Sequence, residues 1–184
     1  MNPIEKLQKI LKEMESNKAP YVTKPEKDFT RKRKITFYDM ICFLLFIDAN
    51  SMAEEIRSAF IDKAFSYISE AANLKNRSKI KVSAFEQLFH KFNETLEVPK
   101  KYKGYRVLAV DGSDFSLLYN INSEYATISN QYGGSNRIRI NFAYDILNKN
   151  FLDYVIEAKK KADERKGAIK MLFCRIGKDF GDNG

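Results

Sequence analysis

The sequence predicts an α+β protein in which a helical region comes first and strands follow. Several segments between residues 3 and 96 repeat apolar side chains at helical spacing, and the clearest amphipathic stripe lies over residues 85–96. Beyond Pro99 the spacing becomes that of strands, with a short apolar run at residues 106–110 and looser alternation at residues 137–147. These observations predict a change of architecture near Pro99.

Two helices are expected at the N-terminal end. Residues 3–16 have helical spacing, and the proline at their start suits a first helical turn. The stretch from Asn17 to Lys34, with two prolines and a basic cluster, is expected to be a linker or an arm. Thr36 is then a suitable N-cap for a helix to Ile47 that is apolar nearly all round, which predicts a central place in the core.

Capping boxes mark two further helices. Ser51 and Glu54 form the first, and Ser83 and Glu86 form the second, at the start of the amphipathic stripe. A short helix over about residues 70–78 is expected between them. The helical region therefore contains five expected helices.

The strand half begins with one strand and a turn. Residues 106–110 predict a buried strand that ends in a turn at Asp111-Gly112-Ser113. Residues 120–136 are polar and are expected to form a long loop. An antiparallel hairpin is then expected over residues 137–157, and a helix over residues 163–173.

Composition and charge narrow the class of partner. The chain has 184 residues, of which 44% are hydrophobic, so it can build a core. Its net charge of +8, from 32 Lys and Arg against 24 Asp and Glu, suggests a polyanionic partner, with nucleic acid ahead of a membrane surface. The two cysteines suggest no disulfide framework, and no apolar run is long enough to span a bilayer. We therefore expect a cytoplasmic protein without a membrane partner.

Asp111 is the residue most suggestive of chemistry. A carboxylate at the tip of a rigid, buried strand is held in place, as metal chemistry requires. Magnesium favours carboxylate oxygens, and a pair of such ions can assist phosphoryl transfer. An ordinary Asp-Gly turn is the alternative explanation of the same residues. Asp114 is a weaker candidate ligand that is expected to face solvent or cap the turn, and Asp145 and Asp153 are expected to face solvent on the hairpin.

Two basic groups are candidates for contacts with DNA phosphates. They are Arg31, Lys32, Arg33 and Lys34, and then Lys75, Arg77, Lys79 and Lys81. A solvated charged loop is the alternative for each group. Three more lysines, Lys100, Lys101 and Lys103, precede the Asp111 strand and favour an approach of DNA to that edge.

Five stretches, in this order and spacing, resemble the IS-four-type DDE transposases of bacterial insertion sequences. They are FTRKRKITFYDMI, NRSKIKVSAFEQLF, YKGYRVLAVDGS, YDILN and ERKGAIKML. The resemblance runs from about Phe29 to Leu172. It implies a helical DNA-binding region (35–99) and the first half of a ribonuclease H-like catalytic domain (100–173), namely strand, antiparallel hairpin and helix. The helix and basic arm expected from residue spacing (1–34) precede them.

The resemblance also implies an activity. It implies Mg²⁺-dependent strand cleavage and transfer at the DNA ends of an insertion sequence, with a second copy or a full-length transposase as further partners. Of the three catalytic acids, the first falls on Asp111, as a metal ligand. The motifs of the second and third acids do not occur, and residues 174–184 depart from the family pattern. We therefore expect a truncated chain that is inactive alone and binds metal weakly.

Two other functions stay open from the sequence. One is a DNA-binding module without catalysis, which would occupy element ends or inhibit a full-length transposase. The other is a free-standing metal nuclease. That nuclease would need a second acid, such as Asp145, beside Asp111, because a single carboxylate is a poor magnesium site.

Overall fold

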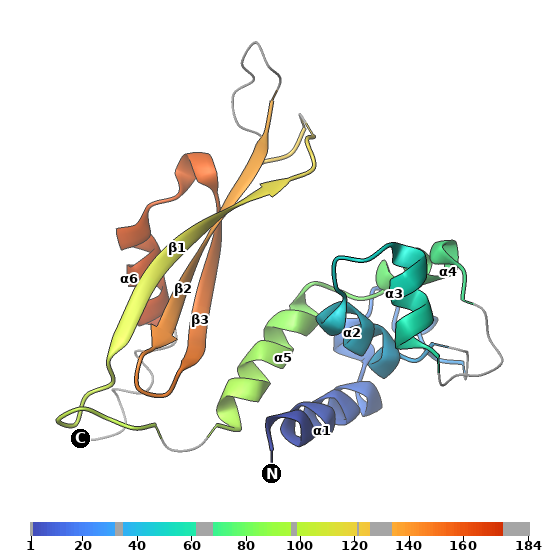
Figure 1. Ribbon diagram of the computed structural model, residues 1–184, viewed down its shortest axis with the longest axis horizontal. Coiled ribbons are helices and arrows are strands. Elements are labelled where there is room, and N and C mark those ends of the chain that lie inside the picture. The colour runs from blue at the N-terminus through green and yellow to red at the C-terminus, as the bar shows by residue number, and fades with distance from the viewer. Residues whose placement is uncertain are drawn as a thin grey trace. The chain divides into compact units, whose positions relative to one another are not determined.

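The structure of the protein is a computed structural model in which the chain forms two compact units. The structure describes residues 2–31, 35–61, 68–96, 99–120, 122–125 and 134–174, with the backbone alone for residues 172–174. The chain divides into two compact units, residues 1–96 and 97–184. Among the described residues, the first unit contains five α-helices, and the second contains one α-helix and a three-stranded antiparallel sheet (Figure 1). The predicted α+β class is confirmed.

The first unit follows the predicted order of helices. They are α1 (Pro3–Ser16), α2 (Phe37–Phe46), α3 (Met52–Ala59), α4 (Glu70–Arg77) and α5 (Ser83–Glu94), with a 3₁₀ turn, η1 (Ala19–Tyr21), after α1. None of the described helices has both the length and the apolar character needed to cross a bilayer.

Side-chain caps account for four of the five helix starts in the first unit, at Asn2, Thr36, Ser51 and Ser69. The hydroxyls of Thr36 and Ser51 each accept a hydrogen bond from the third amide of their helix, which confirms Thr36 as an N-cap. Of the predicted Ser51–Glu54 capping box, the structure shows the Ser51 half, and the Glu54 carboxylate pairs with Arg57 at 3.4 Å. The capping box predicted at Ser83 is wrong. Ser83 is the first residue of α5, and Val82 stands at the cap without a side-chain hydrogen bond.

Helix α2 is the centre of the helical unit, as its all-round apolar surface predicts. Phe37 and Ile41 are fully buried in one cluster with residues of α1 and α5. Met40 and Phe43 are buried in a second cluster with α3, where the Phe43 and Phe60 rings stack at 5.8 Å between centroids. Helix α2 therefore contributes side chains to two hydrophobic clusters.

The described part of the predicted linker is packed against the helical unit. Val22 is fully buried and pairs with Ile80 in an isolated antiparallel bridge. On either side, the Thr23 amide donates to the Lys79 carbonyl, and the Lys81 amide donates to the Tyr21 carbonyl. The linker prediction is therefore wrong for these residues, because their backbone groups pair with the segment between α4 and α5.

The second unit contains the predicted strand, hairpin and helix. The strands are β1 (Leu108–Leu117), β2 (Asn136–Asp145) and β3 (Asn150–Ala158), in the order β1-β2-β3, followed by a 3₁₀ turn, η2 (Lys159–Lys161), and α6 (Glu164–Cys174). The turn predicted at Asp111-Gly112-Ser113 is wrong, because β1 runs through these residues. Asp111 lies opposite Phe142, and Ser113 lies opposite Ile140.

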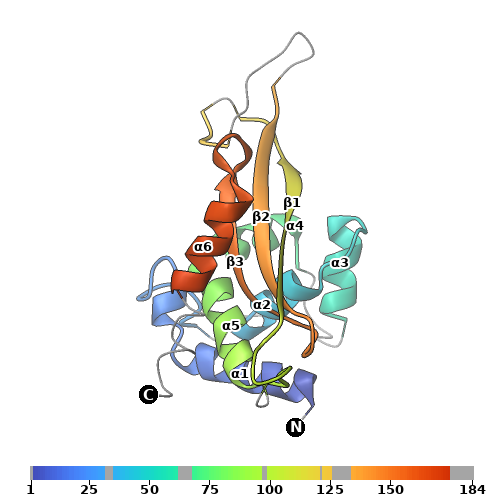
Figure 2. The same ribbon diagram turned by 90° about the vertical axis from the view of Figure 1, so that its left-hand side faces the viewer.

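The two faces of this sheet differ. Helix α6 packs on one face, where Ala143 and Met171 are buried (Figure 2). The opposite face carries aromatic side chains, with the Phe151 ring 5.2 Å from Phe142 and 5.1 Å from Tyr144. Strand β1 is an edge strand, since within the described residues only β2 pairs with it. The surroundings of the Asp111 side chain therefore depend on which face of the sheet it occupies.

Candidate functional site

Asp111 lies in the middle of an exposed strand. Its side chain is on the face opposite α6, because the next residue, Gly112, lies on the α6 face opposite Asn141. One carboxylate oxygen accepts a hydrogen bond of 2.7 Å from the amide of Gly112. The prediction of a buried strand with Asp111 at its tip is therefore wrong: β1 continues beyond Asp111, and the carboxylate faces water.

Close packing explains why position 112, which was predicted to lie in a turn, is a glycine. The fully buried side chain of Asn141 lies between Gly112 of β1 and Gly167 of α6. A Cβ at Gly112 would lie 2.3 Å from Asn141 Oδ1, and a Cβ at Gly167 would lie 2.6 Å from Asn141 Nδ2. Gly112 does not have a positive φ angle, so it serves a close approach rather than a turn.

Asp114 is held by two cations on the α6 side of the sheet. Its oxygens lie 2.8 Å from Arg139 Nε and 2.5 Å from Lys159 Nζ, and Arg139 also reaches Glu164 of α6 at 2.9 Å. Hydrogen bonds from Lys159 and Arg139 lower the pKa of Asp114. Asp114 therefore faces away from Asp111, and its carboxylate neutralises charge within the fold.

Asp145 and Asp153, expected to face solvent, are both buried. Asp145 accepts hydrogen bonds from Arg106 Nε at 3.0 Å and from the amides of Leu147 and Asn148 in the β2–β3 turn. Burial raises the pKa of Asp145, but the hydrogen bonds from Asn148 and Arg106 outweigh it and the pKa is lowered. These partners make burial of the carboxylate tolerable.

The strand register excludes the pairing of Asp111 with Asp145. Asp145 lies opposite Leu108, an odd number of residues from Asp111, so the two carboxylates are on opposite faces of the sheet. Within the described stretches, no three His, Cys, Asp or Glu side chains lie close enough to hold a metal ion. On the face opposite α6, Asp111 is therefore not joined by Asp114 or Asp145. Asp145 is therefore not the second acid that the metal-nuclease alternative needs beside Asp111.

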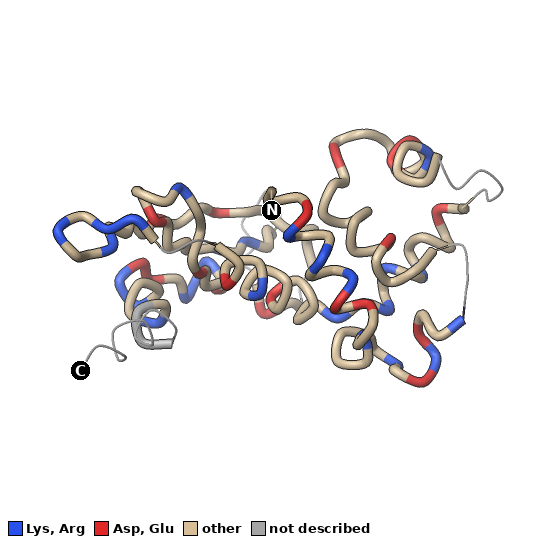
Figure 3. The backbone as a smooth tube through the Cα atoms, turned by 90° about the horizontal axis from the view of Figure 1, so that it is seen from below, with Lys and Arg blue, Asp and Glu red and all other residues tan. Residues whose placement is uncertain are grey.

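Two of the predicted basic residues, Lys79 and Lys81, flank Ile80 in its bridge with Val22. The Nζ of Lys79 lies 5.3 Å from the centre of the Phe29 ring, which joins the two basic segments. Thr23 also contacts Lys79, because its amide and its hydroxyl donate to the Lys79 carbonyl. Residues 24–28 form the turn that connects Thr23 to Phe29. We define the basic surface as Lys24, Lys27, Arg31, Lys75, Arg77, Lys79 and Lys81. Figure 3 shows that Lys and Arg are interspersed with Asp and Glu along the backbone.

The basic surface has charges available to a partner. Among the described residues, none of its seven cations forms a salt bridge, and all except the half-buried Lys79 are exposed. Sequence reasoning missed Lys24 and Lys27, although both lie in the basic segment that ends at Lys34. The predicted contacts Lys32, Arg33 and Lys34 lie outside the described residues.

Three lysines precede β1 in the second unit. Lys100, Lys101 and Lys103 are all exposed. The backbone of Lys100 is joined to the β2–β3 turn, since its amide donates to Asn148 Oδ1 at 2.7 Å. The three lysines lie in the segment before β1, and Asp111 lies within that strand.

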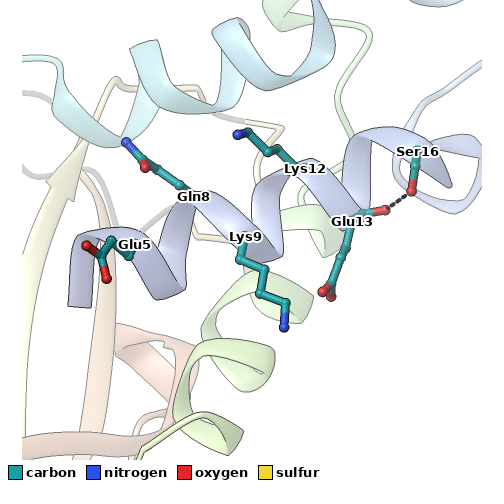
Figure 4. Close-up of a pocket in the computed structure, with 6 residues that line it drawn as sticks. All are labelled: Glu5, Gln8, Lys9, Lys12, Glu13 and Ser16. Carbon is teal, nitrogen blue, oxygen red and sulfur yellow. Dashed lines mark hydrogen bonds between the residues drawn. The ribbon is translucent and has the colours of Figure 1, made fainter. Parts of the chain in front are cut away.

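Two hollows in the first unit offer no reactive group. The described lining of one comes from α1 alone, and Figure 4 shows that Gln8 and Lys12 point to one side of the helix while Lys9 and Glu13 point to the other. The other lies beside the half-buried Cys42. Burial raises the pKa of the Cys42 thiol, which disfavours the nucleophilic thiolate.

No protein-family model, no curated protein and no solved structure matches this chain. The case for a function therefore depends on the residues themselves. Those residues are Asp111 on β1 and the seven cations of the basic surface.

Proposed function

We propose that this chain is a DNA transposase of the DDE class that acts at the ends of an insertion sequence. The resemblance of its five sequence stretches to that family supports the proposal. The observation that carries it is the position of Asp111 on the first strand of a strand, antiparallel hairpin and helix. That order of elements is what the first half of a ribonuclease H-like domain requires.

The proposed role of the basic surface is to hold DNA by its phosphates. Lysine and arginine side chains that neutralise phosphates release counterions, so binding weakens steeply as salt is added. Such contacts position a duplex without reading its sequence. The exposed cations of the two adjoining segments suit this role, because a duplex presents phosphates along its whole length.

Paired substitutions test the DNA-binding role. Lys75→Gln with Arg77→Gln should weaken duplex binding, and the slope of log affinity against log salt concentration should become shallower by roughly 2, since each neutralised phosphate contributes about 0.9 to that slope. Fluorescence anisotropy with a labelled duplex, titrated over salt, measures this. The control Lys9→Gln with Lys12→Gln removes the same charge from α1, and an equal effect there would contradict a localised DNA surface.

The proposed role of Asp111 is to be one carboxylate ligand of Mg²⁺ during strand cleavage. The described residues provide no second ligand beside it, so the remaining ligands would come from residues outside them. Bound Mg²⁺ would supply charge neutralisation at the scissile phosphate. Asp111 would contribute an exposed carboxylate oxygen from β1, a strand whose other face packs against α6.

An asparagine variant tests this role. Although the sequence predicts little or no activity for the chain alone, any strand cleavage that it supports should fall by more than about 100-fold in Asp111→Asn, because even substitutions behind the metal ligands cost about 10–100-fold. The assay is Mg²⁺-dependent nicking of a supercoiled plasmid that carries the DNA flanking the gene. Asp48→Asn is a matched control, since Asp48 is exposed and its carboxylate also accepts a hydrogen bond from the next amide. Cleavage that persists in Asp111→Asn would exclude the catalytic role.

A second candidate is a DNA-binding protein that does not cleave and that occupies element ends or inhibits a full-length transposase. The salt bridges of Asp114 and the opposite-face position of Asp145 favour it, because both keep acids away from Asp111. Salt-sensitive duplex binding with no nicking by the unaltered chain would support this candidate over the first.

A further inference from the structure

The cavity beside Cys42, which is lined by residues of α2 and α3, is acidic and aromatic. Its volume is about 440 Å³, within the range of about 300–1,000 Å³ that is usual for small-molecule sites. The described lining contains four aromatic rings and two carboxylates but no lysine or arginine: Tyr38, Phe43, Phe46 and Phe60, with Asp39 and Glu55. The cavity is therefore acidic in a chain whose net charge is +8.

Glu55 is the unusual member of this lining. It is only 7% exposed, although a glutamate is seldom buried without a partner. One oxygen of its carboxylate accepts a hydrogen bond of 3.1 Å from the Asn50 amide. In the part of the chain that the structure describes, the carboxylate accepts no other hydrogen bond and forms no salt bridge. A buried negative charge therefore lies at the cavity without a compensating cation, which is costly unless a ligand supplies one.

The fold does not require a charge at position 55. A neutral glutamine could accept the same hydrogen bond from the Asn50 amide. The preference of a helix start for negative charge is already met by Glu54, which is exposed in the same turn of α3. Neither local role explains why position 55 is a buried acid, whereas a cation bound in the cavity would pair with its carboxylate.

The aromatic rings of the cavity suit the same kind of partner. The face of an aromatic ring attracts a cation that lies within about 6 Å of its centre. The Phe43 and Phe60 rings are stacked with their centres 5.8 Å apart, and Phe46 is 70% exposed on α2. These rings also offer apolar surface, so the lining can hold a ligand that combines a positive charge with an apolar body.

We infer that this cavity binds a small organic cation. An ammonium group of the ligand pairs with the Glu55 carboxylate, and its apolar body lies against the Phe46 ring. The inference goes beyond the proposed DNA binding and does not rest on it, because none of the described lining residues belongs to the basic surface. It gives the helical unit a site for a ligand whose charge is opposite to that of DNA.

Protection of Cys42 from alkylation measures occupancy, because this half-buried thiol also lines the cavity. The full chain is treated with iodoacetamide, and mass spectrometry follows the peptide that contains Cys42. Phenethylamine, phenethyl alcohol and hydrocinnamate carry the same phenylethyl group with a positive, a neutral and a negative end. Phenethylamine should protect at a concentration about tenfold lower than phenethyl alcohol, since hydrogen bonds to charged groups are the stronger ones. Hydrocinnamate should give no protection.

A neutral variant tests the role of the buried charge. Glu55→Gln keeps an acceptor for the Asn50 amide, and it should weaken protection by phenethylamine about tenfold while leaving protection by phenethyl alcohol unchanged. Glu54→Gln is the matched control, since it removes the same charge from the same turn of α3 outside the described lining. It should change protection by less than about twofold. Thermal unfolding should show that Glu55→Gln stays folded, because it removes a buried charge that has no cation beside it.

A second variant leaves the buried charge in place. Phe46→Leu keeps an apolar side chain but removes the ring, so it should weaken protection by phenethylamine more than protection by phenethyl alcohol. The inference is overturned if the three compounds protect Cys42 equally, if none of them protects it, or if Glu55→Gln behaves like Glu54→Gln. Such a failure would leave the proposed DNA binding intact, because that binding is tested separately with Lys75→Gln and Arg77→Gln.

Discussion

Gly112→Ala should destabilise the second unit by about 3 kcal/mol, at the upper end of the usual cost of overpacking a core. The new Cβ would lie 2.3 Å from Asn141 Oδ1, and Asn141 is enclosed between β1 and α6. The amide cannot move aside without displacing Gly167, which limits its other end. Hydrogen exchange of β2 amides, which reports on this unit alone, measures the loss of stability.

A second substitution should rescue the first. Neither end of the Asn141 amide has a hydrogen-bond partner among the described residues, so Asn141→Ala removes a buried polar group at little cost. Asn141→Ala should therefore restore most of the stability that Gly112→Ala removes, with a coupling energy of about 2 kcal/mol. Gly104→Ala is the control: its strain comes from a φ of +85° with no atom in the way, so Asn141→Ala should not relieve it. Additive effects of Gly112→Ala and Asn141→Ala would contradict this packing.

Arg106→Gln should cost about 3 kcal/mol of stability at neutral pH, because it leaves a buried carboxylate without its cation. Asp145 is fully buried, and Arg106 Nε donates to it at 3.0 Å. Arg137→Gln is a matched control, since Arg137 is an exposed arginine on β2, and it should change stability by less than about 0.5 kcal/mol. An Arg106→Gln protein as stable as the control would contradict the proposed role of this ion pair.

The same pair gives the second unit a dependence on pH. The pKa of Asp145 is lowered in the folded chain, so the unfolded chain binds this proton more readily. Its contribution to stability is complete above the ordinary aspartate pKa of about 3.9 and is lost as the pH falls through the lower folded value. The difference between the unaltered chain and Arg106→Gln should therefore shrink at low pH, as urea unfolding over a pH series would show.

Much of the element order could be predicted because its signals are local. The Thr36 and Ser51 caps, the spacing of α5 and the alternation of the hairpin each act within a few neighbouring residues. The start of α5 shows the limit of such signals, since Ser83 had a suitable partner in Glu86 and yet Val82 stands at the cap. There, the pairing of Ile80 with Val22 holds the preceding backbone.

The candidate site depended more on interactions between distant residues. An Asp-Gly pair is compatible with a turn or with a strand, and a glycine was required here by Asn141 and Gly167, which lie on other elements. Asp145 was expected to face water because no property of its own segment shows that Arg106 lies opposite. Charge and residue type could be recognised from the sequence, but the faces on which these residues lie could not.

The sequence by itself determined the helices and strands, their order, and the positive charge of the segments that form the basic surface, since hydrophobic spacing, capping and charge belong to short stretches of chain. Only the tertiary structure decided that Asp111 faces away from Asp114 and Asp145, that Gly112 makes room for Asn141, and that residues 22–31 lie beside residues 79–81. The physical reason is that strand register and side-chain packing couple residues far apart in the chain.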